Sequence, residues 1–166
     1  MDPDKAVSMQ TNINGLTLRP ATAADAAAIC SVVAASHEHL TQHDDYHDLV
    51  AASEADIAAE ITVDTQQPFV MCHDGTIVGT ISLIQYQSTV FGLSYWIGAA
   101  FASRGFTGAA VETVIQHAIA NPGATEIWAG IKHANTPSIR LMTRLGFKLA
   151  REPNTHLSYC LTVQAD

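Results

Sequence analysis

A turn of small residues near the middle of the chain has the composition of a phosphate-binding loop. Residues 93–97 predict an apolar strand, residues 98–104 a turn, and residues 105–120 a helix. The first N–H groups of a helix have no partner inside it, and the helix dipole places about half a positive charge there. Small residues let a phosphate approach, and Arg104 adds a fixed cation. The stretch predicts a phosphorylated cofactor at residues 104–108, or alternatively an ordinary strand-to-helix turn in which the glycine serves packing.

Half of the histidines lie in one short stretch, residues 37–48. His39, His43 and His47 are spaced by four, so on a helix they would share one face, a spacing that can bind a metal. The stretch could instead form a substrate-facing wall with a titratable base, because histidine titrates near neutral pH, or a solvated surface. No further ligand cluster accompanies it, so we expect no metal.

The periodicity around these stretches predicts alternating strands and helices. Asp74-Gly75 is a strong signal for a two-residue hairpin, so the strands before and after it should be antiparallel. A helix between the strands at 90–97 and 125–131 predicts a crossover that makes these two strands parallel. The remaining strands are expected at 16–19, 68–73, 76–86, 147–150 and 156–163, and the remaining helices at 23–36, at 53–63 and from Asn135 onwards.

The composition favours one globular domain. Of the 166 residues, 48% are hydrophobic and 14% are charged, which is typical of a compact fold. Residues 1–13 predict a flexible leader without the apolar stretch of a signal peptide, and residues 14–166 a single domain. No apolar run approaches the roughly 20 residues of a membrane span. Three scattered cysteines indicate neither a metal site nor a disulfide framework, so we expect a cytoplasmic protein.

The charge is unevenly distributed along the chain. Residues 1–102 contain two Lys/Arg against twelve Asp/Glu, a net charge of −10, whereas residues 103–166 carry a net charge of +2. A net acidic protein is a poor general binder of nucleic acid. The acidic first part suits a cationic substrate such as an amine, or simply makes a soluble surface.

The order of elements, together with three stretches, resembles the GNAT superfamily of acyl-CoA N-acetyltransferases. Within it, the chain is most similar to the ribosomal-protein serine/alanine N-acetyltransferase branch. The resemblance rests on L-R-P-A-T-A-A-D at 18–25, on Y-W-I-G at 95–98 followed by S-R-G-F-T-G-A-A-V at 103–111, and on N-T-P-S-I-R-L-M-T-R-L-G-F at 135–147. It implies an α/β (α+β) GNAT fold with a mixed, mostly antiparallel twisted sheet of about seven strands, about four helices and a splayed parallel pair at the cofactor site.

The resemblance also implies a reaction and its residues. An acetyl group would pass from acetyl-CoA to a primary amine, either a small cationic amine or a protein N-terminus, by direct attack in a ternary complex. Asn135 would hydrogen-bond the pantetheine or acetyl end of the cofactor, and Ser138 would protonate the departing thiolate. The cofactor is expected to lie against Tyr95, Trp96, Ile97, Arg104, Gly105, Phe106, Thr107, Gly108 and Asn135.

The chain departs from the family pattern at five positions. Ala102 and Thr107 replace the usual ends of the pyrophosphate loop, and Ser103 replaces its usual first glycine in this branch. Met142 stands where many members have a tyrosine acid, and Gly92 where this branch often has a glutamate base. These departures leave two alternatives open: a GNAT-fold binding or regulatory module without transferase activity, and an acyltransferase with a different acyl donor.

Without the strand glutamate, a base must come from another element. His37, Glu38 and His39, at the end of the first predicted helix, are the candidates, either directly or through water. His39, His43 and Tyr46 are the residues expected to face the acceptor. A homodimer through the closing strands remains an open alternative.

Overall fold

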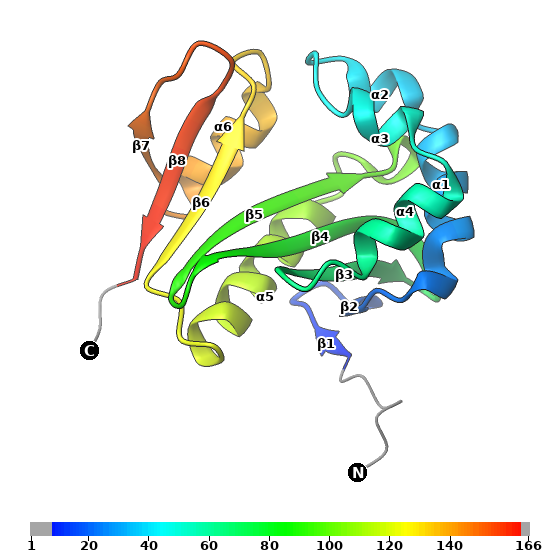
Figure 1. The fold of residues 1–166 in the computed structure, drawn as a ribbon, viewed down its shortest axis with the longest axis horizontal. Coiled ribbons are helices and arrows are strands. Elements are labelled where there is room, and N and C mark those ends of the chain that lie inside the picture. Colours follow the sequence, from blue (N-terminus) through cyan, green and yellow to red (C-terminus); the bar gives the residue numbers. More distant parts are fainter. Residues whose placement is uncertain (1–7, 164–166) are drawn as a thin grey trace.

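The computed structural model describes residues 8–163, which form one eight-stranded sheet flanked by helices (Figure 1). The strand order is β1-β2-β3-β4-β5-β6-β8-β7. All neighbours are antiparallel except β5 and β6, which pair in parallel. The mixed, mostly antiparallel sheet with its one parallel pair is therefore confirmed, with β1 as a short additional strand.

The bounds of the elements follow the sequence expectations closely. The strands are β1 (Met9–Gln10), β2 (Leu16–Pro20), β3 (Gln66–His73), β4 (Thr76–Gln87), β5 (Val90–Ile97), β6 (Glu126–Ile131), β7 (Lys148–Arg151) and β8 (Leu157–Thr162). The helices are α1 (Ala26–Ala34), α2 (His37–Thr41), α3 (His47–Ala51), α4 (Glu54–Ile61), α5 (Phe106–Ala120) and α6 (Thr136–Arg144), with short 3₁₀ turns at Ala23–Asp25 and Ala99–Phe101.

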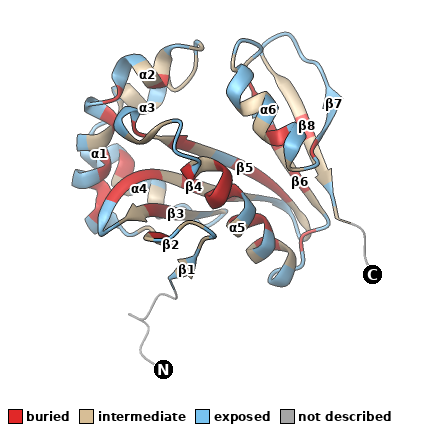
Figure 2. Cartoon of the chain, turned by 180° about the vertical axis from the view of Figure 1, so that it is seen from behind, coloured by how far each residue is buried: buried red, intermediate tan, exposed pale blue. Residues whose placement is uncertain are grey.

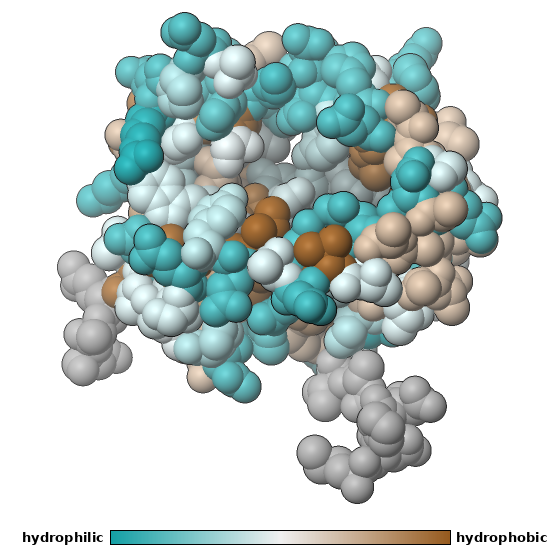
Figure 3. Space-filling view, in the orientation of Figure 1, coloured by the Kyte–Doolittle hydropathy of each residue, from teal (hydrophilic) through white to brown (hydrophobic). Residues whose placement is uncertain are grey.

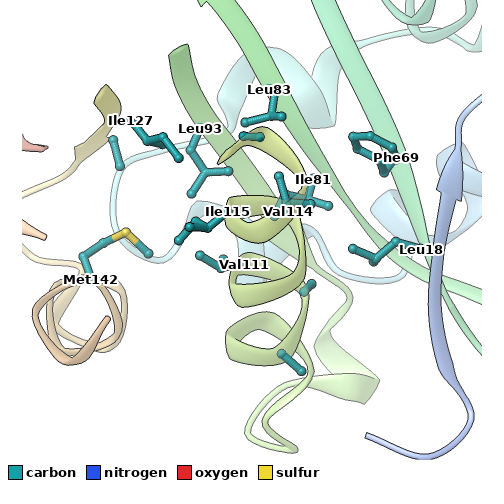
Figure 4. Close-up of a cluster of buried hydrophobic side chains, with 14 of the residues drawn as sticks. Leu18, Phe69, Ile81, Leu83, Leu93, Val111, Val114, Ile115, Ile127 and Met142 are labelled. Carbon is teal, nitrogen blue, oxygen red and sulfur yellow. The ribbon is translucent and has the colours of Figure 1, made fainter. Parts of the chain in front are cut away.

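The two faces of the sheet bury separate apolar clusters. Helix α5 packs on one face, where Val111 and Val114 are fully buried beside side chains of β2, β3, β4 and β5 (Figure 4). Helices α1 and α4 cover the other face, against Trp96 and Val70. Buried residues concentrate in the middle strands and on the inner sides of these helices, whereas β7 is exposed along its length (Figure 2). The sheet thus holds β5 rigidly between two apolar layers.

Two expectations for the first third of the chain need correction. Residues 37–48 do not form the single helix on which His39, His43 and His47 would share a face. Helix α2 ends at Thr41 and α3 begins at His47, because Asp44 and Tyr46 adopt left-handed backbone conformations with φ of 57° and 59°. Within the part of the chain that the structure describes, no group of three or more His, Cys, Asp or Glu could hold a metal.

The second correction concerns the N-terminal segment. Residues 1–7 of the expected leader lie outside the described residues. Met9–Gln10, within the same segment, pair with Leu18 and Thr17 as the edge strand β1. Among residues 8–163, no helix is long and apolar enough to cross a membrane.

An ion pair fixes the start of the first helix. Arg19 at the end of β2 donates two hydrogen bonds to the Asp25 carboxylate, at 2.9 and 2.8 Å. The same carboxylate accepts from the Thr22 backbone N–H at 2.8 Å. The hydrogen bonds from Arg19 hold the pKa of Asp25 below its ordinary value, against the opposing effect of burial.

We expect Asp25→Asn to lower the free energy of unfolding by about 1–3 kcal/mol at pH 7, because the bonds to a charged carboxylate are lost. A lowered folded-state pKa stabilises the protein above the ordinary carboxyl pKa, and this contribution disappears as pH falls through the lowered value. Urea unfolding at pH 7 and near pH 3 would therefore show the deficit shrinking in acid. Asp64→Asn, at an exposed position, is the control. A deficit that is unchanged in acid would contradict the ion-pair explanation.

Candidate active site

A cleft of about 550 Å³ lies at the end of β5. Its walls come from three parts of the chain: the last residues of β5 with the loop into α5, the first turn of α6, and the segment joining α2 to α3. Figure 1 shows β6 and α6 diverging from β5 here, and Figure 3 shows the surface hollowed between the two halves. The cleft therefore forms where the sheet opens.

The opening is caused by the short pairing between the parallel strands. Residues Val90, Phe91 and Gly92 pair with Glu126, Ile127 and Trp128, and the ladder ends there. On the other edge of β5 the pairing with β4 continues to Ile97, and the Gly98 N–H donates to the Val78 carbonyl at 2.7 Å. Backbone groups alternate in direction along an antiparallel strand, so those of residues 93, 95 and 97 face the opening.

The start of α5 closes one end of the cleft. Gly105 is the N-cap with φ of 79°, and the first intrahelical bond runs from the Ala109 N–H to the Gly105 carbonyl at 3.2 Å. A glycine cap has no side chain to satisfy the N–H groups of Phe106, Thr107 and Gly108, which have no partner inside the helix. Arg104 is exposed and its guanidinium lies 4.7 Å from the centroid of the Phe106 ring, outside the cleft lining.

The first turn of α6 forms the facing wall. Asn135 is the N-cap, and its side chain accepts a hydrogen bond from the Ser138 N–H at 3.3 Å. Asn135 makes this capping bond and still lines the cleft, and Ser138 lines it too. Met142, one turn further along, is fully buried in the core (Figure 4), so this position provides no acid at the cleft.

Tyr95 places a second hydroxyl beside Ser138. Its phenol oxygen is buried and has no hydrogen-bond partner within bonding geometry among the described residues. Burial raises the pKa of Tyr95, while the neighbouring Ser138 side chain acts in the opposite direction. A buried polar atom without a partner is costly. The geometry therefore offers a protonated phenol and a serine hydroxyl to whatever occupies the cleft.

Tyr46 connects the α2–α3 segment to the open strand. Its hydroxyl donates a short hydrogen bond to the backbone carbonyl of Tyr95, one of the groups that face the opening. Burial raises the pKa of Tyr46, so the phenol stays protonated and remains a donor. This single contact fixes the turn containing the two left-handed residues against β5.

The structure places most of the site residues predicted from the sequence around the cleft. His37 and Glu38 are exposed on α2 and do not line the cleft. Sequence analysis missed several apolar lining residues, among them Leu141, although its spacing of three from Ser138 places both on one face of α6. The predicted residues that line the cleft are His39, His43, Tyr46, Tyr95, Trp96, Ile97, Gly105, Phe106, Thr107, Gly108, Asn135 and Ser138.

The Tyr86 side chain lies over position 92 of β5. A β-carbon built on Gly92 would lie 2.4 Å from the Tyr86 hydroxyl oxygen and 2.7 Å from its Cζ. Tyr86 is 61% exposed and its ring crosses this point of the strand. A phenol thus fills the space where the related branch often has a glutamate.

These features define an acyltransferase of the GNAT type. Residues 15–148 match the family of the acetyltransferase (GNAT) domain, and the chain belongs to this family. The family and the fold expected from the sequence are therefore confirmed. No curated protein matches the sequence.

Solved structures share the whole fold at low identity. A RimL ribosomal L7/L12 alpha-N-protein acetyltransferase in complex with coenzyme A has a TM-score of 0.82 and 14% identity, over 96% of this chain and 100% of that one. RimJ from Mycobacterium smegmatis, with a CoA-disulfide, has a TM-score of 0.72 and 20% identity, over 95% and 86%. The microcin C7 self-immunity acetyltransferase MccE, with acetyl-CoA and AMP, has a TM-score of 0.74 and 16% identity, over 91% and 94%.

The contact between Tyr46 and Tyr95 predicts a measurable loss of stability. Tyr46→Phe should lower the free energy of unfolding by about 1–3 kcal/mol, because the Tyr95 carbonyl loses the donor that covers it. Tyr86→Phe is the matched control, since it removes a hydroxyl from an exposed tyrosine and should change stability by less than about 0.5 kcal/mol. Urea unfolding of the three proteins measures both values. Equal stability of the two variants would contradict the role given to the contact.

Proposed function

We propose that this protein transfers an acetyl group from acetyl-CoA to a primary amine in a ternary complex. The observation that carries the proposal is the open edge of β5, which runs directly to the uncapped N-terminus of α5. Membership of the acetyltransferase (GNAT) family supports the same reaction. Similar structures that hold CoA or acetyl-CoA support the choice of cofactor.

The residues present suit a pantetheine arm followed by phosphates. The backbone groups of residues 93, 95 and 97 that face the opening would bond the amides of the arm as a neighbouring strand does, apart from the Tyr95 carbonyl, which already accepts from Tyr46. The free N–H groups of Phe106, Thr107 and Gly108 would bind the pyrophosphate, aided by the helix dipole. Gly105 keeps the left-handed cap that aims them, with φ of 79°. When bound, acetyl-CoA supplies an acetyl group activated as a thioester.

The hydroxyls of Ser138 and Tyr95 are the proposed source of the proton for catalysis. The nitrogen of the neutral amine would form the new N–C bond and give up one proton to water or to His39, while the C–S bond breaks. The departing thiolate would take a proton from one of these hydroxyls, which then regains a proton from water. A free backbone N–H of β5 would polarise the thioester carbonyl. The protein otherwise contributes by holding the two reactants in line. Of the base candidates, His39 lines the cleft, whereas His37 and Glu38 would act only through water.

Cofactor binding is the first test of the proposal. Ligand at about 100 times its Kd should add about 2.7 kcal/mol of stability, so acetyl-CoA and CoA, but not ATP, should raise the Tm. Gly105→Ala should lose this shift, because an alanine at positive φ costs about 1–2 kcal/mol and misaligns the helix start.

Gly123→Ala is the matched control for this test. Gly123 also has positive φ and an open surrounding, but it follows α5 at the opposite end. It should lower the Tm while retaining the acetyl-CoA shift. Absence of any shift in the wild-type protein would contradict the transferase and favour a binding module without CoA.

The proton source is tested by steady-state kinetics. We expect Ser138→Ala and Tyr95→Phe each to lower kcat about tenfold and the double variant to lower it at least about 100-fold, because general acids contribute on this scale. Thr143→Ala, which removes an exposed hydroxyl from the same helix, should leave kcat unchanged. Unchanged kcat in the double variant would assign the proton to solvent.

A further inference from the structure

A second cavity of about 190 Å³ adjoins the main cleft. The two cavities share four lining residues, Tyr46, Tyr95, Asn135 and Ser138. Since Tyr95 and Ser138 carry the hydroxyls at the proposed reaction centre, the second cavity ends at that centre. It is too small for a nucleotide and large enough for the end of a narrow chain.

Asp45 is the one carboxylate among the residues that line the two cavities. Its Oδ1 accepts the Tyr46 N–H at 2.8 Å, which leaves Oδ2 free of described partners. No described Lys, Arg or His forms an ion pair with it. Tyr46 in turn is fixed to the Tyr95 carbonyl. The carboxylate is therefore held in place by the backbone of β5 without being neutralised.

The strand itself offers no carboxylate at this point. Gly92 lacks a side chain and the Tyr86 ring fills the space above it. The negative charge available near the opening comes instead from the left-handed turn between α2 and α3.

The small cavity continues into a larger one of about 600 Å³. The two share Leu93, Ala129 and Gly130, and the His156 ring lies beside Gly130, where a β-carbon would come within 3.2 Å of its Cδ2. The larger cavity is floored by Trp128, over which the Arg151 guanidinium lies at 5.3 Å from the ring centroid. An acceptor can therefore extend outwards from the reaction centre along β6.

We propose that the small cavity receives the ammonium end of the acceptor and that the Asp45 carboxylate binds it. The inference rests on the proposed function, which it deepens by naming the recognising group. A partly buried carboxylate attracts a cation more strongly than an exposed one, because screening by water is reduced. The bound ammonium loses its proton to water before attack, so Asp45 positions the amine and takes no part in bond making. The body of the acceptor extends towards the larger cavity.

The test compares Asp45→Asn with Asp48→Asn. Asparagine keeps the Oδ1 acceptor for the Tyr46 N–H, so the turn is preserved while the charge is removed. Asp48 is exposed on α3 and outside the three cavities, so its variant removes the same charge from the same segment. Acetyl transfer is measured with spermidine, with a hexapeptide bearing a free N-terminal serine, and with hydroxylamine, which is uncharged at neutral pH.

We expect Asp45→Asn to raise KM for the cationic acceptor about 10- to 100-fold, the scale of a hydrogen bond to a charged group. Transfer to hydroxylamine and the Tm shift with acetyl-CoA should be unchanged, and Asp48→Asn should behave as wild type. Equal losses for hydroxylamine and for the cationic acceptor would overturn the inference, because they would indicate a distorted site.

A binding measurement separates this inference from the proposed function. Calorimetry of spermidine and of the peptide against the CoA-saturated protein requires no transfer. Binding of either probe that weakens in Asp45→Asn and not in Asp48→Asn supports the inference even where no acetylation is found. Identical Kd values in the two variants, or no binding of either probe to the wild-type protein, would overturn it.

Discussion

The structure depends on the early end of the β5–β6 ladder. Three residue pairs hold the parallel strands together, and beyond Gly92 the backbone groups of alternate residues of β5 face a cleft. Unpaired backbone groups are unfavourable when buried, so such an edge is normally covered or paired. Here apolar layers pack on both faces of β5, and its pairing with β4 fixes the register. The cleft thus has the width and direction of an additional strand, and β5, which forms one side of it, is held in place by the rest of the sheet.

The contacts around this cleft are made by elements from distant parts of the chain. Helix α5 brings uncapped N–H groups to one end, α6 brings Ser138, and the turn between α2 and α3 bonds the Tyr95 carbonyl through Tyr46. Each element is fixed by its own local chemistry: a left-handed glycine, an asparagine cap and a buried phenol. A group that enters the cleft meets a surface that needs little rearrangement, which lowers the entropy lost on binding.

Local sequence patterns predicted most of the fold and many of the residues that line the cleft. The Asp74-Gly75 hairpin, the crossover through α5 and the Asn135 cap all depend on neighbouring residues, so their patterns were sufficient. The segment at 37–48 was not predictable in this way. Its helical histidine spacing is overridden by a tertiary contact, the bond from Tyr46 to a strand 49 residues away. The unpartnered hydroxyl of Tyr95 could not be predicted from the sequence either, because only the packed structure shows that it lacks a partner.

The Tyr86 side chain over Gly92 affects how this site can change. A glutamate introduced at position 92 would meet only the far end of the Tyr86 side chain, which is 61% exposed and can turn aside into solvent. A strand carboxylate is therefore one substitution and one side-chain rotation away from the present sequence. In the present sequence the negative charge near the opening comes instead from the acidic segment after α2.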